Sequence, residues 1–177
     1  MKKFAMAAAT AALLLSVSTG ALAATGLGSV TSMSGSAATA DKAGSVTVNT
    51  TMCALELDDE GKIVSVSFDI AQNKIGFDAA GALTTDLAAE HPTKKELKEG
   101  YGMKGASSIG KEWYEQAEAL EAWCVGKTVA EVVGMPTYDK GDGHHTQVPD
   151  DVDLKSGCTI DVGSFLKAIQ AAANNAK

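Results

Sequence analysis

The sequence predicts an α+β fold in which a small antiparallel sheet packs against an amphipathic main helix and a C-terminal helix. Three patterns carry this prediction. Apolar and polar residues alternate over residues 64–70, as in a strand with one buried face. Apolar residues recur at helical spacing over residues 111–124 and again over 162–173. Strand patterns therefore come first along the chain and the main helical patterns later, which is typical of an antiparallel sheet with helices on one face.

Residues 1–23 have the parts of a secretory signal peptide: Lys2 and Lys3, an apolar run over residues 4–17, and a small-residue exit ending at Ala23. We expect cleavage there, so that the mature chain starts at Ala24, and we expect no lipid anchor, because no cysteine lies at the cleavage site and the first cysteine is Cys53. The apolar run is shorter than the ~20 residues that span a bilayer. The expected location is therefore exported, periplasmic or extracellular, with no permanent membrane span.

Charge and cysteine content narrow the function. The chain carries 15 basic residues, all lysine, and a formal net charge of −7. An acidic chain without arginine is a poor partner for a polyanion, so we expect no nucleic acid. Cys53 and Cys124 lie in apolar segments and are expected in the core, and with Cys158 they allow at most one internal disulfide. Whether one forms stays open, and no zinc signature is present.

We predict a flexible, Ser/Thr/Ala/Gly-rich segment over residues 24–44, with one short strand at 29–33, and a single domain over residues 45–177. In that domain, strands over 45–57 and 64–70 form the N-terminal β-hairpin around a turn at 58–62. A change of apolar phase near residues 52–54 predicts a bulge or a strand boundary.

Shorter elements follow the hairpin. Residues 74–77 are expected to form a third strand and 83–87 a fourth. Thr93 and Glu96 have the spacing of a capping box, which starts a short helix ending by Gly100.

The main helix follows a glycine-rich loop at residues 100–110. Its apolar stripe is expected to dock on the sheet, and its glutamates are expected to face water. Gly126 is suited to the helix end, and a second capping box at Thr128 and Glu131 starts another short helix. The stripe comprises Trp113, Ala117, Leu120 and Cys124, and the glutamates are Glu112, Glu115, Glu118 and Glu121.

Two candidate sites are weak on chemical grounds. Residues 105–112 nearly match a P-loop, but Glu112 replaces the hydroxyl that should bind magnesium, which excludes nucleotide hydrolysis. A single phosphate at this helix start, beside Lys104 or Lys111, is a remaining alternative to a packing loop. His144 and His145 lie in an acidic loop over residues 138–153, which we interpret as solvated, because nothing fixes a ligand set for a metal. We assign no metal site and no catalytic residue.

The segment Asp153-Leu-Lys-Ser156-Gly157-Cys158-Thr159 is more specific. It resembles the flavin-attachment motif D-x-x-[ST]-G-A-[ST] of the exported FMN-binding domain family. By position, Asp153, Ser156 and Gly157 match the motif, Thr159 is the acceptor, and Cys158 replaces the usual alanine. The region from about residue 73 to 126 is also similar to exported bacterial proteins related to these domains.

The resemblance implies a flavoprotein acting in extracytoplasmic electron transfer. In the family, a flavin transferase joins FMN through its phosphate to the hydroxyl of the last motif residue, here Thr159. FMN is thus the implied cofactor, the transferase and an unidentified redox partner of the cell envelope are the implied partners, and an electron carrier is favoured over a stand-alone enzyme. Tyr101, Trp113 and Tyr114 are candidates for packing against the flavin, as alternatives to core positions. The alternative function is a degenerate, non-flavin secreted binding module.

Overall fold

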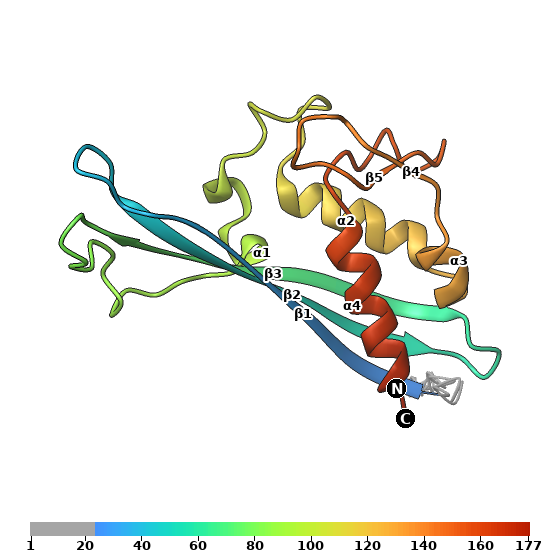
Figure 1. Cartoon of the computed structure of the whole chain (residues 1–177). Helices are drawn as coiled ribbons and strands as arrows, with labels where there is room; N and C mark the ends of the chain where they lie inside the picture. The colour runs from blue at the N-terminus through green and yellow to red at the C-terminus, as the bar shows by residue number, and fades with distance from the viewer. Residues whose placement is uncertain (1–23) are drawn as a thin grey trace, which may run out of the picture.

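The structure is a computed structural model that describes residues 24–177, and the predicted signal peptide, residues 1–23, lies outside them. It has the predicted α+β architecture, with a three-stranded antiparallel sheet, a small two-stranded sheet and four α-helices (Figure 1). The elements are, in chain order, β1 (Ala24–Ser36), β2 (Gly44–Leu57), β3 (Ile63–Phe77), α1 (Lys94–Leu97), the 3₁₀ turn η1 (Lys98–Tyr101), α2 (Trp113–Cys124), α3 (Val129–Val133), β4 (Thr137–Tyr138), β5 (Val148–Pro149) and α4 (Gly163–Asn174). None of the helices in the described residues is long and apolar enough to cross a membrane.

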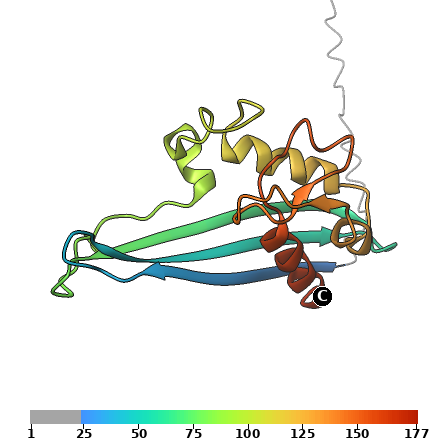
Figure 2. The ribbon, with the colours of Figure 1, turned by 45° about the horizontal axis from the view of Figure 1, so that its top comes forward.

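The main sheet has the order β1-β2-β3, and helices cover one of its faces. Figure 2 shows α2 and α4 on the same side of the sheet, with α4 in contact with β1 and β2, and α2 in contact with β3. Where the helices lie, the strand residues on that side are buried, whereas Leu27, Ala54 and Ser67 on the other side are exposed. This division between a buried and a solvated face is common in antiparallel sheets and confirms the alternation over β3.

The core lies between the sheet and the two long helices. Phe165 of α4 is its centre, because its ring centroid lies 5.1 Å from that of Phe68 and 5.9 Å from that of Trp113. The predicted stripe of α2 is confirmed, since none of its four residues is more than 3% exposed. The helix side contributes Trp113, Ala117, Leu120, Cys124, Phe165, Leu166, Ala168, Ile169 and Ala172.

The segment predicted to be flexible contains the first strand. Residues 24–36 form β1, which pairs with β2 from Ala24 opposite Leu57 to Ser36 opposite Ser45. The strand expected at 29–33 lies within β1, but the expected flexibility of the segment is wrong. Glycine, serine and threonine weaken a strand pattern, although pairing partners and a packed helix can still hold the strand. The folded unit therefore begins before residue 45.

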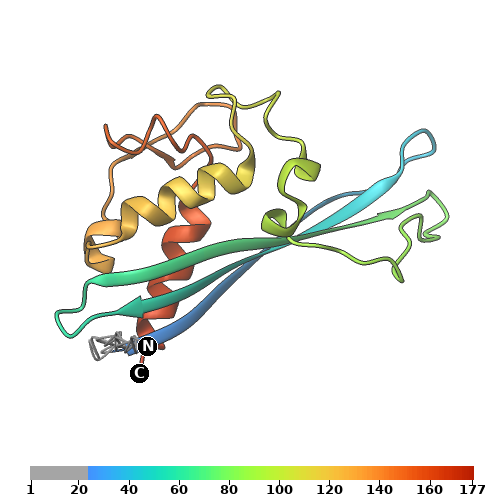
Figure 3. The same ribbon diagram turned by 180° about the vertical axis from the view of Figure 1, so that it is seen from behind.

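Three other expectations about strands need correction. The strand predicted at 74–77 is the end of a continuous β3, and the strand predicted at 83–87 is reduced to one bridge between Phe77 and Leu83. Figure 3 shows this part of the chain running back beside the end of β3 that extends past the helices. The bulge lies between Glu56 and Leu57, not near residue 53. It leaves Val64 45% exposed, because the extra residue shifts the alternation.

Both predicted capping boxes are present, at Thr93 with Glu96 and at Thr128 with Glu131. Gly126 adopts φ +81°, the left-handed conformation expected after a helix end. The glutamates of α2 are only partly as predicted. Glu118 is exposed, but Glu121 is half-buried and accepts hydrogen bonds from the Phe68 backbone N–H and from Lys95, which covers the outer edge of β3.

Helix α4 lies directly on the backbone of β1. A Cβ on Gly28 would overlap backbone atoms of Ala168 and Ala172, neither of which can move without shifting the helix. We expect Gly28→Ala to lower the free energy of unfolding by about 1–3 kcal/mol, as overpacked cores generally do. Urea denaturation measures this loss. Gly105→Ala is the control, because no atom lies within 4 Å of its added Cβ, and an equal loss in both variants would contradict the close packing.

Candidate functional site

The turn that carries the motif, residues 153–159 (the motif turn), is fixed to α2 through Asp151. Its Oδ1 accepts hydrogen bonds from the backbone N–H groups of Asp153 and Leu154, at 2.9 and 3.2 Å, and from Trp123 Nε1 at 3.1 Å. Leu154 and Cys158 are buried beneath the turn, with exposed fractions of 2% and 0%. The turn is therefore held at a defined position on α2.

The motif residues have different places in this turn. Asp153 and Ser156 are exposed, and within the described residues no hydrogen bond joins their side chains to Thr159. Gly157 faces α2 so closely that a Cβ there would lie 2.9 Å from Ala119 Cβ. Only glycine thus lets the turn approach the helix, which explains this position of the motif in physical terms.

Thr159 is half-buried and hydrogen-bonded at its backbone and its side chain. Its N–H donates to Gln116 Oε1 at 2.8 Å, and its Oγ1 donates to the same oxygen at 3.2 Å. Its carbonyl accepts a hydrogen bond from Lys140 Nζ at 3.0 Å. Lys111 Nζ lies 4.0 Å from the position that a Gly157 Cβ would take. One ammonium group therefore lies at the Thr159 backbone, and a second lies beside Gly157 in the same turn.

A cavity of about 500 Å³ adjoins this turn, and Ile160 and Asp161, which follow Thr159, form part of its wall. Its volume is in the range of small-molecule and cofactor sites. It is lined by residues from the sheet, from the region between α1 and the start of α2, and from the start of α4. The loop over residues 138–153 that contains His144 and His145, here called the histidine loop, also contributes. The lining residues are Ser32, Asn49, Thr51, Ile70, Gln72, Lys94, Tyr101, Met103, Trp113, His144, His145, Ile160, Asp161 and Ser164.

Two hollows of similar volume, about 530 and 580 Å³, involve Leu27 and Ala54 on the uncovered side of the sheet. Neither is lined by a residue of the motif turn or by the two residues that follow it. The cavity lined by Ile160 and Asp161 is therefore the candidate site, because it has the volume of a cofactor site and its wall directly follows the motif in the chain.

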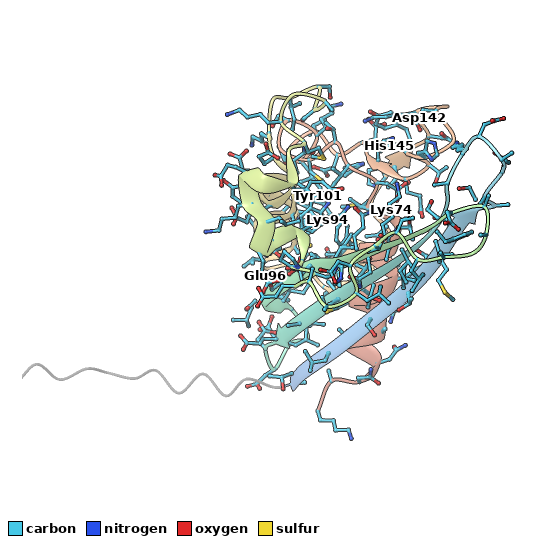
Figure 4. The ribbon with its side chains drawn as sticks, turned by 90° about the vertical axis from the view of Figure 1, so that its left-hand side faces the viewer. Lys74, Lys94, Glu96, Tyr101, Asp142 and His145 are labelled. Carbon is cyan, nitrogen blue, oxygen red and sulfur yellow. The ribbon has the colours of Figure 1, made fainter. Side chains whose placement is uncertain are left out.

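One wall of the cavity combines a cation with aromatic rings. Lys94 Nζ lies 4.7 Å from the ring centroid of Tyr101 and 5.3 Å from that of Trp113. Within the described residues Lys94 forms no ion pair. Its charge interacts with the two ring faces and can also interact with an electron-rich ligand. Figure 4 shows Lys94 and Tyr101 close together, apart from Asp142 and His145 on the histidine loop.

The histidine loop is ordered by its own hydrogen bonds. Asp142 accepts the backbone N–H groups of His144 and His145, and its Oδ2 lies 2.6 Å from His145 Nδ1. These bonds hold the pKa of the Asp142 carboxyl well below its usual range, with the two backbone bonds as the main cause. Residues 24–177 contain no group of three or more His, Cys, Asp or Glu side chains arranged to hold a metal ion.

The glycine-rich loop at residues 100–110 holds no free anion site at the start of α2. Glu112 is 5% exposed, and its carboxylate accepts the backbone N–H groups of Met103 and Lys104, at 2.8 and 3.1 Å. The expectation that Glu112 faces water is wrong, and so is the alternative of a phosphate at this helix start. A carboxylate of the chain already occupies the position and would repel one.

The three cysteines are free and buried. Burial raises the pKa of Cys53 and Cys124 to about 12 and that of Cys158 to about 11. They stay protonated at neutral pH and act as small core residues, as predicted for Cys53 and Cys124.

The structure separates the predicted aromatic candidates. Tyr101 and Trp113 line the cavity, but Tyr114 does not, and its hydroxyl donates to Glu99 at 2.9 Å. Sequence reasoning missed Lys94 and Gln116. Gln116 lies three positions after Trp113, on the buried stripe of α2. A polar residue at a position expected to be buried was the signal that could have pointed to it.

No protein-family model matches the chain, and no solved structure matches it. A chlorophenol reductase of Desulfitobacterium hafniense is 38% identical over 96 residues, which cover 48% of this chain and 29% of that protein. The chain thus spans less than a third of that relative's length. The similarity hints at a redox-related family and does not by itself identify an FMN-binding domain.

Proposed function

We propose that this protein carries FMN as a phosphoester on Thr159 and serves in electron transfer outside the cytoplasm. The observation that supports this most is that Ile160 and Asp161, directly after the acceptor residue, line a cavity with a cationic and aromatic wall. The partial similarity to a chlorophenol reductase agrees with a redox role. Export is proposed from the signal-peptide pattern of residues 1–23.

The residues present fit FMN both at its phosphate and at its ring. Lys111 and Lys140, beside the motif turn, are suited to the charge of a phosphodiester. Half-buried Tyr101 offers a face for a flat ring, Trp113 supports that wall from the core, and Lys94 is suited to the electron-rich edge of the ring. FMN supplies the redox chemistry when bound, and the protein provides attachment, orientation and shielding from water.

Attachment needs an activated phosphoryl donor, since joining a hydroxyl to free FMN would require the loss of water. A flavin dinucleotide has the necessary anhydride. With such a donor, Thr159 Oγ would form the new bond to phosphorus as the anhydride P–O bond breaks. The nucleoside monophosphate would be the leaving group, and the hydroxyl proton would pass to the flavin transferase.

A degenerate binding module without flavin is the second candidate, because Cys158 replaces the usual alanine of the motif. The Cys158 side chain is fully buried in the core, however, so the substitution leaves the outer surface of the turn unchanged. This placement favours a functional motif over a degenerate one.

The test is coexpression of the full chain with an active flavin transferase. We expect the intact mass to increase by one FMN phosphoester and the yellow colour to persist after denaturation. Coexpression with an inactive transferase variant is the control and should give the unmodified mass. A chain that stays colourless beside an active transferase would exclude covalent attachment and favour the binding module.

A further inference from the structure

Gln116 is a fully buried polar side chain in direct contact with the proposed acceptor. Its exposed fraction is 0%, and both ends of its amide are hydrogen-bonded. Nε2 donates to Ser107 Oγ and to the Lys111 carbonyl, each at 3.1 Å. Oε1 accepts from the N–H and the Oγ of Thr159, at 2.8 and 3.2 Å.

These partners fix the orientation of the amide. The backbone N–H of Thr159 can only donate, and the Lys111 carbonyl can only accept. A flipped amide would place two donors together at Thr159 and two acceptors together at Lys111. The oxygen of Gln116 therefore faces Thr159, and the Thr159 hydroxyl must be the donor in their bond.

This arrangement decides where the hydroxyl lone pairs point. Because the Oγ proton is directed at Gln116, the lone pairs of Oγ are directed away from α2. We propose that Gln116 is the positioning residue for flavin attachment, holding the Thr159 hydroxyl so that its lone pairs face the incoming phosphorus. This inference rests on the proposed function. An amide is no base, so the Oγ–H···Oε1 bond must break as the bond from Oγ to phosphorus forms, and the released proton then passes to the transferase.

The glycine-rich loop gains a role through the same contacts. Ser107 and Lys111, which belong to this loop and its junction with α2, hold the nitrogen end of Gln116. Glu112 closes the loop from within by accepting two of its backbone N–H groups. The loop thus supports Gln116, which in turn orients Thr159. After esterification the Thr159 N–H can keep its bond to Gln116, so the turn stays in place.

The experiment measures kcat and KM for FMN attachment to the purified full chain by a purified transferase, followed by intact mass. Gln116→Met removes the acceptor with little change of volume. We expect kcat to fall about tenfold with KM nearly unchanged, since the turn recognised by the transferase remains. Gln170→Met, at an exposed position of α4, is the matched control and should react like the wild type.

Ser107→Ala is the milder second variant, because it removes one of the two anchors of Gln116. It should lower kcat by a smaller factor, and the double variant should react no more slowly than Gln116→Met alone. Near-UV circular dichroism identifies folded variants, and if Gln116→Met does not fold, Ser107→Ala decides. If both folded variants are modified at the wild-type kcat, the positioning role of Gln116 is overturned and the proposed function is not. A wild-type chain that takes no FMN would overturn the proposed function and this role with it.

Discussion

Thr159→Ala is expected to abolish covalent FMN while the fold survives. Only a hydroxyl can form the phosphoester, and the other motif hydroxyl, Ser156, lies elsewhere on the exposed turn. The variant keeps the backbone bond from residue 159 to Gln116 and loses only the side-chain bond. The loss of stability is therefore expected to be about 1 kcal/mol. Intact mass after coexpression with the transferase measures the modification, and urea denaturation measures the stability.

Two further substitutions serve as controls for Thr159→Ala. Thr159→Ser should retain the modification because it keeps the nucleophile. Cys158→Ala should leave the yield unchanged, since its side chain points into the core and not toward the transferase. If Thr159→Ala is still modified, another hydroxyl is the acceptor and the assignment of Thr159 fails.

Trp113→Ala should cause a large loss of stability, roughly 3–5 kcal/mol, because truncating a buried aromatic residue leaves a void. Trp113 is 3% exposed and packs against Phe165 at the centre of the core. Urea or thermal denaturation of the full chain measures the loss.

The same substitution has a graded control. Trp113→Phe keeps one ring against Phe165 and should lose less than half as much stability. A loss below about 1 kcal/mol for Trp113→Ala would contradict the packing described here.

The parts of the fold that follow local rules could be predicted from the sequence. The alternation over β3, the stripe of α2 and both capping boxes depend on residues close together in the chain. Strand β1 could not be predicted in the same way, because Gly26 and Gly28 lie beneath α4, which follows more than a hundred residues later. The exposure of Val64 likewise depends on the pairing of β2 with β3, which a single strand does not reveal.

The candidate site likewise has one part that could be predicted from the sequence and one part that depends on the fold. The motif turn is contiguous, so Thr159 could be singled out from sequence. The cavity beside it combines residues of the sheet, α1, the histidine loop and α4. Lys94 looks like an ordinary helix lysine until the fold places Tyr101 and Trp113 next to it. Sequence distance hides such contacts, whereas residues in one turn are neighbours by covalent structure.

Hydrogen bonds join the two ends of the described chain, and these contacts bear on the order in which the chain folds. Thr25 exchanges backbone hydrogen bonds with Lys177, and Asn175 donates to the Leu27 carbonyl, 148 positions earlier. Contacts between such distant segments form slowly, because a long stretch of chain must first be brought together. Thr159 lies just before α4, the helix that these contacts dock. The docking of α4 on β1 is therefore expected to be among the slower steps of folding.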